Sequence, residues 1–216
     1  MAMDSTKNVM INDPRLVLDN ALLTEAYANC RMFLRSWERF ESLRAQPPPP
    51  PVPPFPKPMD DPWVLERRRW EFDLWGCVYA MVASARRLHG VLWEAPGCRA
   101  MREKYGLPTS GPLRDRDVIE VRDALEHAGN RLETFSRSSP GMGLSGWAVT
   151  SNPNSKAPPN IVRFRWLDLY AYVCLVRAEH DESKCNLRRL AAAVIELESK
   201  LPVATGGMLV GLPPQD

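Results

Sequence analysis

A proline-rich tract between residues 47 and 58 divides the N-terminal half of this 216-residue chain. Proline lacks the backbone N–H that helix and sheet interiors need, so the tract predicts an extended polyproline II segment. Apolar residues recur every three or four positions on both sides of it, which is typical of helices. We therefore expect two long helices joined by a stiff connector. A ligand for an SH3-type domain is the alternative role of the tract.

Helix starts are marked at Asp13-Pro14 and at Asp61-Pro62, where an N-cap residue is followed by proline at the first helical position. Gly106 and Pro108 mark a stop, because neither residue continues a helix well. The apolar stripes predict helices at 13–46, 62–92, 97–105 and 112–137, and a last one that begins at Ser183 or Asn186 and ends at Leu201.

The composition changes between residues 141 and 178. Val162, Phe164 and Trp166 alternate with polar or outward positions, which predicts a half-buried strand with a hairpin partner at 170–176. A helix over 165–178 is the competing interpretation. The expected fold is mainly α, an antiparallel four-helix bundle with a small antiparallel β insertion near 145–177. We expect the domain to span 13–202, between a flexible tail at 1–12 and a disordered tail at 203–216.

The net charge and the cysteine pattern give no indication of a nucleic-acid-binding protein or of a zinc protein. A formal net charge of +2 is too small to indicate nucleic-acid binding by itself, although 22 of the 28 basic residues are arginines, which suit phosphate and carboxylate. High genomic GC content would produce the same excess. The five cysteines are scattered without a C-x-x-C pair, and His180 with Cys185 does not make a zinc site. No metal and no cofactor is therefore expected.

The chain shows no membrane or secretion signal. Residues 1–10 lack the apolar core of a signal peptide, and the uncharged run at 74–85 is too short to cross a bilayer. Together with the odd number of cysteines, this predicts a cytoplasmic protein with reduced thiols.

The most informative stretch for function runs from Arg122 to His127. The Arg122 guanidinium is always charged, and the His127 imidazole titrates near neutrality. The two residues lie five positions apart on a predicted helix. On a helical wheel they lie at the two edges of the polar face, opposite an apolar stripe that includes Leu125. Asp123 is spaced to contact His127, and Arg122 is spaced to pair with Glu126. An ordinary solvated helix face would carry the same residues.

The same stretch resembles the signature of the HEPN superfamily, Arg-x(4–6)-His with Asn, Asp or His after the arginine. Arg122, Asp123 and His127 match that signature residue by residue. The resemblance covers the helical parts of the chain, at 13–137 and 186–201. It implies a helical bundle that dimerises and brings two Arg–His helices into one cleft. The proline tract and the β insertion are not general features of that family.

The resemblance also implies a chemistry, since many HEPN proteins are metal-independent endoribonucleases of toxin or defence systems. His127 would move the proton of a ribose 2′-hydroxyl or of the leaving oxygen, and Arg122 would stabilise the charge on phosphorus. Asp123 would orient His127, while the RNA would be contacted by residues of the same helix, namely Glu126, Asn130 and Arg131. Implied partners are RNA or a nucleotide, a second copy of the chain, and a cognate antitoxin or nucleotidyltransferase.

Non-catalytic functions remain open. Other HEPN proteins only bind nucleotides or act as scaffolds, so this chain is equally interpreted as a helical interaction protein or an RNA-binding module. His89, beside Arg86 and Arg87, is expected to be a cation at a helix C-terminus, where the helix dipole favours positive charge.

Overall fold

The computed structural model describes most of the helical part of the chain and several short strands. The described residues are 14–47, 49, 61–126, 143–145, 148–150, 161–163, 165–169, 173–178, 181–202, 204–205 and 208–209. Within them the protein is mainly helical, as the apolar periodicity predicts. No helix in these ranges has both the length and the apolar character of a membrane span.

The helices lie close to their predicted positions, and their bounds are α1 Pro14–Ala45, α2 Pro62–His89, α3 Cys98–Tyr105, α4 Arg116–Glu126 and α6 Leu187–Lys200. The helix predicted at 112–137 begins at Arg116 instead of Pro112, because residues 112–115 form a turn and a bend. A short π-helical segment, η1 Gly90–Glu94, extends α2, so the predicted end near residue 92 falls inside an irregular turn.

Local signals in the sequence explain where the helices begin and end. The Asp61 carboxylate accepts a hydrogen bond from the Trp63 N–H at 3.0 Å, which confirms the predicted N-cap of α2. The Asn186 side chain caps α6 in the same way, with a 3.0 Å bond from the Arg189 N–H. At the end of α3, Gly106 adopts a φ of 59°, which is the left-handed conformation that glycine provides at little cost.

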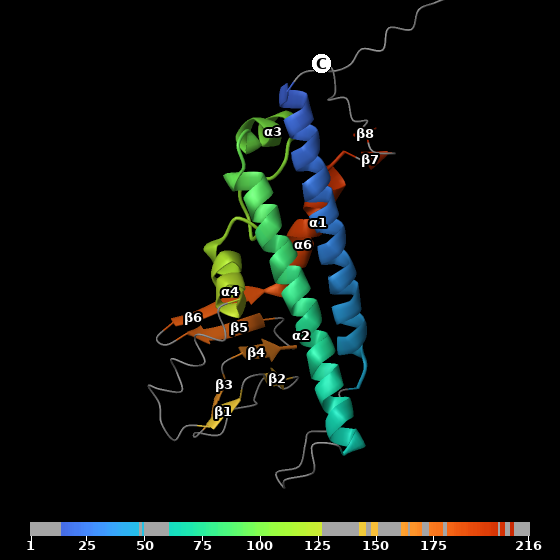
Figure 1. Cartoon of the computed structure of the whole chain (residues 1–216), viewed down its shortest axis with the longest axis vertical. Helices are drawn as coiled ribbons and strands as arrows, with labels where there is room; N and C mark the ends of the chain where they lie inside the picture. The colour runs from blue at the N-terminus through green and yellow to red at the C-terminus, as the bar shows by residue number, and fades with distance from the viewer. Residues whose placement is uncertain are drawn as a thin grey trace, which may run out of the picture.

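Helices α1 and α2 form the long axis of the molecule. Figure 1 shows them side by side and running in opposite directions, with α4 beside α2 and α6 behind both. Trp70 on α2 donates its indole N–H to the Leu43 carbonyl at the end of α1, at 3.3 Å. The Arg67 guanidinium donates to the Pro49 carbonyl at 2.7 Å. Most of the predicted proline connector lies outside the described residues.

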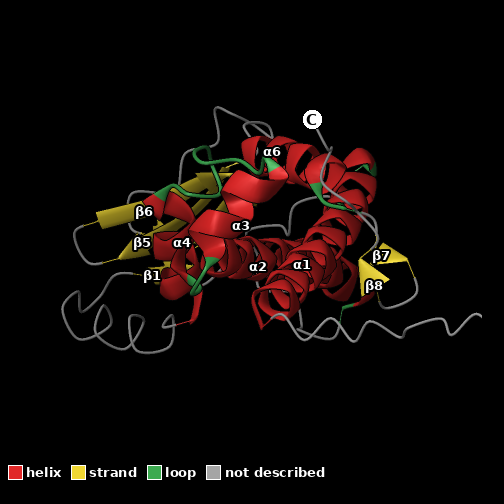
Figure 2. Ribbon diagram, turned by 90° about the horizontal axis from the view of Figure 1, so that it is seen from above, coloured by secondary structure: helices red, strands yellow, loops and turns green. Residues whose placement is uncertain are grey.

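The core lies between α1, α2, α4 and α6. Figure 2 looks along the long axis that α1 and α2 form, with α6 crossing one side of the pair. The members of the core include most residues of the expected apolar stripes, together with Phe33, Trp75, Met101 and Leu167, which the stripes did not include. The largest fully buried side chains are Trp75, Phe33, Phe40, Leu23, Leu74, Met81, Leu88, Leu92, Met101, Leu167, Leu187 and Leu190. Removing such a large side chain costs about 2–5 kcal/mol, so the core fixes the relative positions of the helices.

Most of the strands form small sheets beside α4, while the last two pair with each other near α1. Their bounds are β1 Gly143–Ser145, β2 Ala148–Thr150, β3 Ile161–Arg163, β4 Arg165–Asp168, β5 Val173–Ala178, β6 Asp181–Asn186, β7 Ala204–Thr205 and β8 Met208–Leu209. The strand order of the largest sheet is β2-β4-β5-β6, while β1 pairs with β3 and β7 with β8.

Two features of the sheet differ from the sequence-based expectation. β2 pairs with β4 in parallel, and β1 with β3 likewise, so the β region is not purely antiparallel. A parallel neighbour needs a crossover connection, which the chain between Thr150 and Arg165 provides. The strands also continue past residue 178, since β6 pairs antiparallel with β5 and leads directly into α6. Ser183 is therefore a strand residue and not a helix start.

Candidate functional site

Helix α4 is anchored by one face and leaves the other accessible. Val118, Val121, Ala124 and Leu125 are buried against the rest of the fold. Arg122 lies at the edge of this buried face, and its side chain is 35% exposed. The predicted polar face of the helix is therefore present as far as Glu126, the last described residue of α4.

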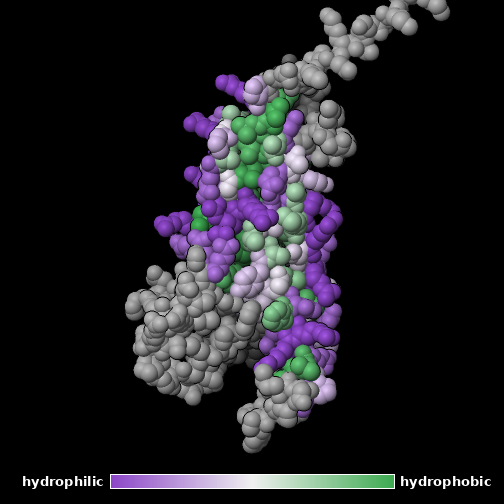
Figure 3. Space-filling model, viewed as in Figure 1, coloured by the Kyte–Doolittle hydropathy of each residue, from purple (hydrophilic) through white to green (hydrophobic). Residues whose placement is uncertain are grey.

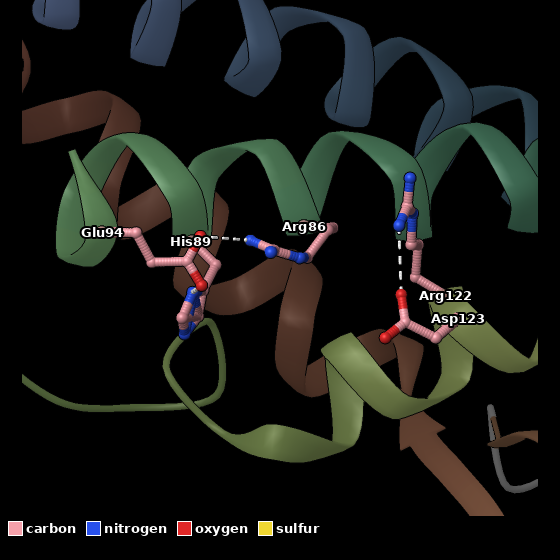
Figure 4. Close-up of polar contacts among 5 residues, drawn as sticks. All are labelled: Arg86, His89, Glu94, Arg122 and Asp123. Atoms are coloured by element: carbon pink, nitrogen blue, oxygen red, sulfur yellow. Dashed lines mark hydrogen bonds and ion pairs between the residues drawn. The ribbon is translucent and has the colours of Figure 1, made fainter.

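Arg122 is held by carboxylates of its own helix. Its Nη2 atom lies 2.5 Å from Oε1 of Glu126, which confirms the predicted pair of these residues. Its Nη1 atom donates to Oδ1 of Asp123 at 3.1 Å. Figure 4 shows the Arg122 side chain extending from α4 toward α2, with Asp123 below it. The guanidinium is thus oriented, and its charge is offset by neighbours that are themselves half exposed.

The remaining predicted site residues lie outside the described part of the chain. These are His127, which directly follows α4, together with Asn130 and Arg131. The contact expected between Asp123 and His127 therefore stays a prediction. Asp123 already binds Arg122, so it acts on the guanidinium whether or not it also orients the imidazole.

A second polar cluster, which the sequence did not predict, surrounds His89 at the junction of α2 and η1. His89 ends α2 as expected, but it is only 8% exposed, so the prediction that it is a cation there is wrong. Burial lowers the pKa of the imidazole, and the nearby guanidinium groups of Arg86 and Arg114 lower it further. The Glu94 carboxylate, 3.6 Å from Nδ1, opposes this shift without overcoming it. His89 is therefore neutral near pH 7.

The π-helical segment brings the members of this cluster together. The Glu94 carboxylate pairs with the Arg86 guanidinium at 2.9 Å, as Figure 4 shows. The two residues are eight positions apart in the sequence. The rings of His89 and Trp93 lie 5.5 Å apart. No described residue forms a hydrogen bond with His89 Nδ1, Trp93 Nε1 or Arg102 Nε, although all three atoms are buried. Such a concentration of unsatisfied polar atoms is uncommon in folded proteins.

A signal for the burial of His89 was present in the sequence. His89 follows Ala85 by four positions and directly follows Leu88, and both of those residues are buried members of the apolar stripe. Periodicity alone therefore placed His89 at the edge of the buried face.

Among the described residues, no group of three or more His, Cys, Asp or Glu side chains is arranged to hold a metal ion. Comparison with known proteins adds no assignment. The chain matches no protein-family model, no curated protein and no solved structure. Any functional conclusion must therefore come from the residues and their geometry.

Proposed function

We propose that this chain is a HEPN-like protein and a metal-independent endoribonuclease of the toxin or defence type, located in the cytoplasm. In this proposal α1, α2, α4 and α6 correspond to an antiparallel four-helix bundle, and Arg122 with His127 forms the site. The observation that supports it is the position of Arg122, which is oriented by two carboxylates and partly accessible at the edge of the buried face of α4.

The proposed reaction is an internal transfer at phosphorus. His127 removes the proton from a ribose 2′-hydroxyl, and the resulting oxygen attacks the adjacent phosphorus while the 5′-oxygen leaves and is protonated. Arg122 stabilises the additional negative charge on the phosphoryl oxygens. The products are a 2′,3′-cyclic phosphate and a 5′-hydroxyl. DNA lacks the 2′-hydroxyl and is not a substrate.

The ion pairs of Arg122 are compatible with this role. Its partners Asp123 and Glu126 are 44% and 47% exposed, and exposed pairs of this kind contribute only about 0–1 kcal/mol. A phosphate that binds the guanidinium through two hydrogen bonds displaces them at little cost. In the free protein the carboxylates hold the side chain in place, which reduces the entropy lost when RNA binds.

Site-directed variants test the assignment. We expect His127→Ala and Arg122→Ala to lower the rate of RNA cleavage by at least about 100-fold, because each removes a group that acts in the transition state. The assay uses a fluorescent single-stranded RNA with EDTA present, and thermal melting verifies that each variant is folded. Arg116→Ala is the matched control, since Arg116 lies on the same helix, is 87% exposed and also pairs with a glutamate.

The identity of the nucleophile is checked in the same assay. An RNA with a single 2′-deoxyribose at the cleaved position should remain intact. Undiminished cleavage by a folded His127→Ala protein would remove the assignment, and so would equal losses in Arg116→Ala and Arg122→Ala.

We also propose that the active protein is a homodimer in which the α4 helices of two subunits face one cleft. A toxin of this kind requires a neutralising partner, for which an antitoxin protein or a nucleotidyltransferase is the expected class. Asn130 and Arg131 would contact the RNA backbone beside the cleft, with Glu126 at its edge.

A specific observation favours a second candidate, a helical interaction protein. Leu16, Leu18 and Ala100 line a hollow of about 780 Å³ between α1 and α3, with Arg15 and Lys104 at its edge. Figure 3 shows the apolar surface at this end of the molecule. An apolar hollow with charged edges suits the side chain of a partner protein. RNA cleavage that depends on His127 decides between the two candidates.

A further inference from the structure

A shallow hollow of about 390 Å³ lies between α1 and α2, away from the residues of the proposed nuclease site. Arg35 and Arg39 line it from α1, and Phe72 and Gly76 line it from α2. Each pair is spaced four residues apart, so its members share one face of their helix. The hollow thus has a cationic wall and an aromatic wall.

Gly76 forms the open floor of this hollow. A Cβ atom added at Gly76 would meet no other atom within 4 Å, so close packing does not require glycine there. The residue lies within the regular helix α2 and its φ is not positive, so the backbone does not require glycine either. Glycine in a helix interior costs about 0.5–1 kcal/mol relative to alanine. What it provides is free space above the helix backbone.

The aromatic wall is unusually exposed. Phe72 is 68% exposed, more than any other large apolar side chain in the described part of the chain. The exposed part of this aromatic ring is a surface on which a nucleobase can stack.

The cationic wall has charge available for an anion. Arg35 is exposed and forms no ion pair with a described residue. Arg39 lies 3.6 Å from Asp73, and both side chains are largely exposed, so this pair is weak. One carboxylate against two guanidinium groups leaves the hollow with a net positive charge. Guanidinium groups bind phosphate through paired hydrogen bonds.

We propose that this hollow binds single-stranded nucleic acid, with a base stacked on Phe72 and a backbone phosphate held by Arg35 and Arg39. The combination of an aromatic platform and a cationic edge is the one that single-strand binding uses. The two guanidinium groups need an anion opposite them, which a nucleic acid supplies at every nucleotide. The site does not depend on cleavage at Arg122, so the two proposals can fail separately.

Fluorescence anisotropy with a labelled uridine RNA of about twelve nucleotides tests the proposal. The full chain carries His127→Ala throughout, so that the RNA stays intact even if the nuclease proposal holds. Gly76→Leu fills the hollow and Phe72→Ala removes the stacking face, and each should raise the Kd about tenfold or more. The melting temperature of Gly76→Leu should not fall, because leucine favours helix more than glycine does.

Three controls separate this site from general electrostatic attraction. Arg35→Ala should reduce the slope of log Kd against log salt by about 0.7, the value for one phosphate contact of a single strand. Leu65→Ala, at another exposed apolar position of α2, and Arg99→Ala, at an exposed cation of α3, should leave the Kd unchanged.

Several results would overturn the proposal. They are absence of RNA binding by the parent protein, an unchanged Kd in Gly76→Leu, and an equal loss of affinity in Arg99→Ala. Binding of free AMP without binding of the RNA would assign the hollow to a mononucleotide. Dissociation of a dimer by Phe72→Ala, seen by light scattering, would assign this face to a second copy of the chain.

Discussion

At the scale of single residues, burial determines what the charged groups of this protein can do. His89 and Arg122 both come from polar stretches of predicted helices, but their environments are opposite. His89 is buried without a hydrogen bond to Nδ1 from any described residue, while Arg122 is half exposed and bound to carboxylates. The imidazole is therefore kept neutral by its surroundings, and the guanidinium stays available to an anion.

The lowered pKa of His89 predicts that the protein loses stability in mild acid. In the unfolded chain this histidine takes up a proton near pH 6.5, whereas the folded state resists it to a lower pH. Between those values the unfolded state binds more protons, so the free energy of unfolding should decrease as the pH falls below about 6.5. Urea denaturation between pH 7.5 and about 5 measures this decrease.

The control is His89→Gln, which cannot titrate in this range. Its free energy of unfolding should depend less on pH than that of the parent, and the difference between the two curves isolates His89 from the other histidines. Identical slopes would mean that Glu94, the acidic neighbour of this imidazole, compensates for the burial and for the Arg86 and Arg114 cations.

At the scale of elements, capping and periodicity explain most helix boundaries, but not the irregular turn after α2. The π-helical segment follows α2 directly, beginning at Gly90 and ending at Glu94. A widened turn shifts the following side chains around the helix axis, and it allows Glu94 to reach both Arg86 and His89. Insertions of this kind often accompany functional sites, and this one coincides with the buried histidine.

The N-cap of α2 allows a quantitative test at this scale. Asp61→Ala removes the acceptor of the Trp63 N–H and should lower the free energy of unfolding by about 1 kcal/mol. Asp61→Asn keeps an acceptor in the same place and should lower it much less. Urea denaturation compares the two variants. Equal losses would show that the negative charge of Asp61 near the helix dipole matters more than the hydrogen bond.

At the scale of the whole molecule, the α1–α2 pair is the support on which the other elements are placed. Helix α4 packs against α2 and α6 packs against α1, and the sheet that contains β5 and β6 adjoins α4. The α4 site and the hollow between α1 and α2 are consequently built on rigid helices. The proposed nuclease activity further requires two such molecules, since its cleft is shared.

Mixing of inactive variants tests whether the cleft is shared. Arg122→Ala and His127→Ala should each be inactive, yet a mixture that exchanges subunits should recover cleavage, because a mixed dimer contains one intact guanidinium and one intact imidazole. Light scattering should give twice the chain mass for each protein. A monomer at high micromolar concentration, or a mixture that stays inactive while subunits exchange, would contradict the shared cleft.

The sequence by itself determined the helices from Pro14, Pro62, Cys98 and Leu187, together with their buried faces. These features are local, because capping and apolar spacing act between residues that are close in the chain. The ion pair of Arg122 with Glu126 was predictable for the same reason.

Only the tertiary structure decided the burial of His89, the parallel pairing of β2 with β4, and the hollow beside Gly76. Each of these depends on contacts between segments that are distant in sequence. Local periodicity fixes which side of an element is apolar, but not which neighbour covers that side or leaves a gap beside it. For this protein that choice separates a buried imidazole from an exposed one, and a packed glycine from one that lines a hollow.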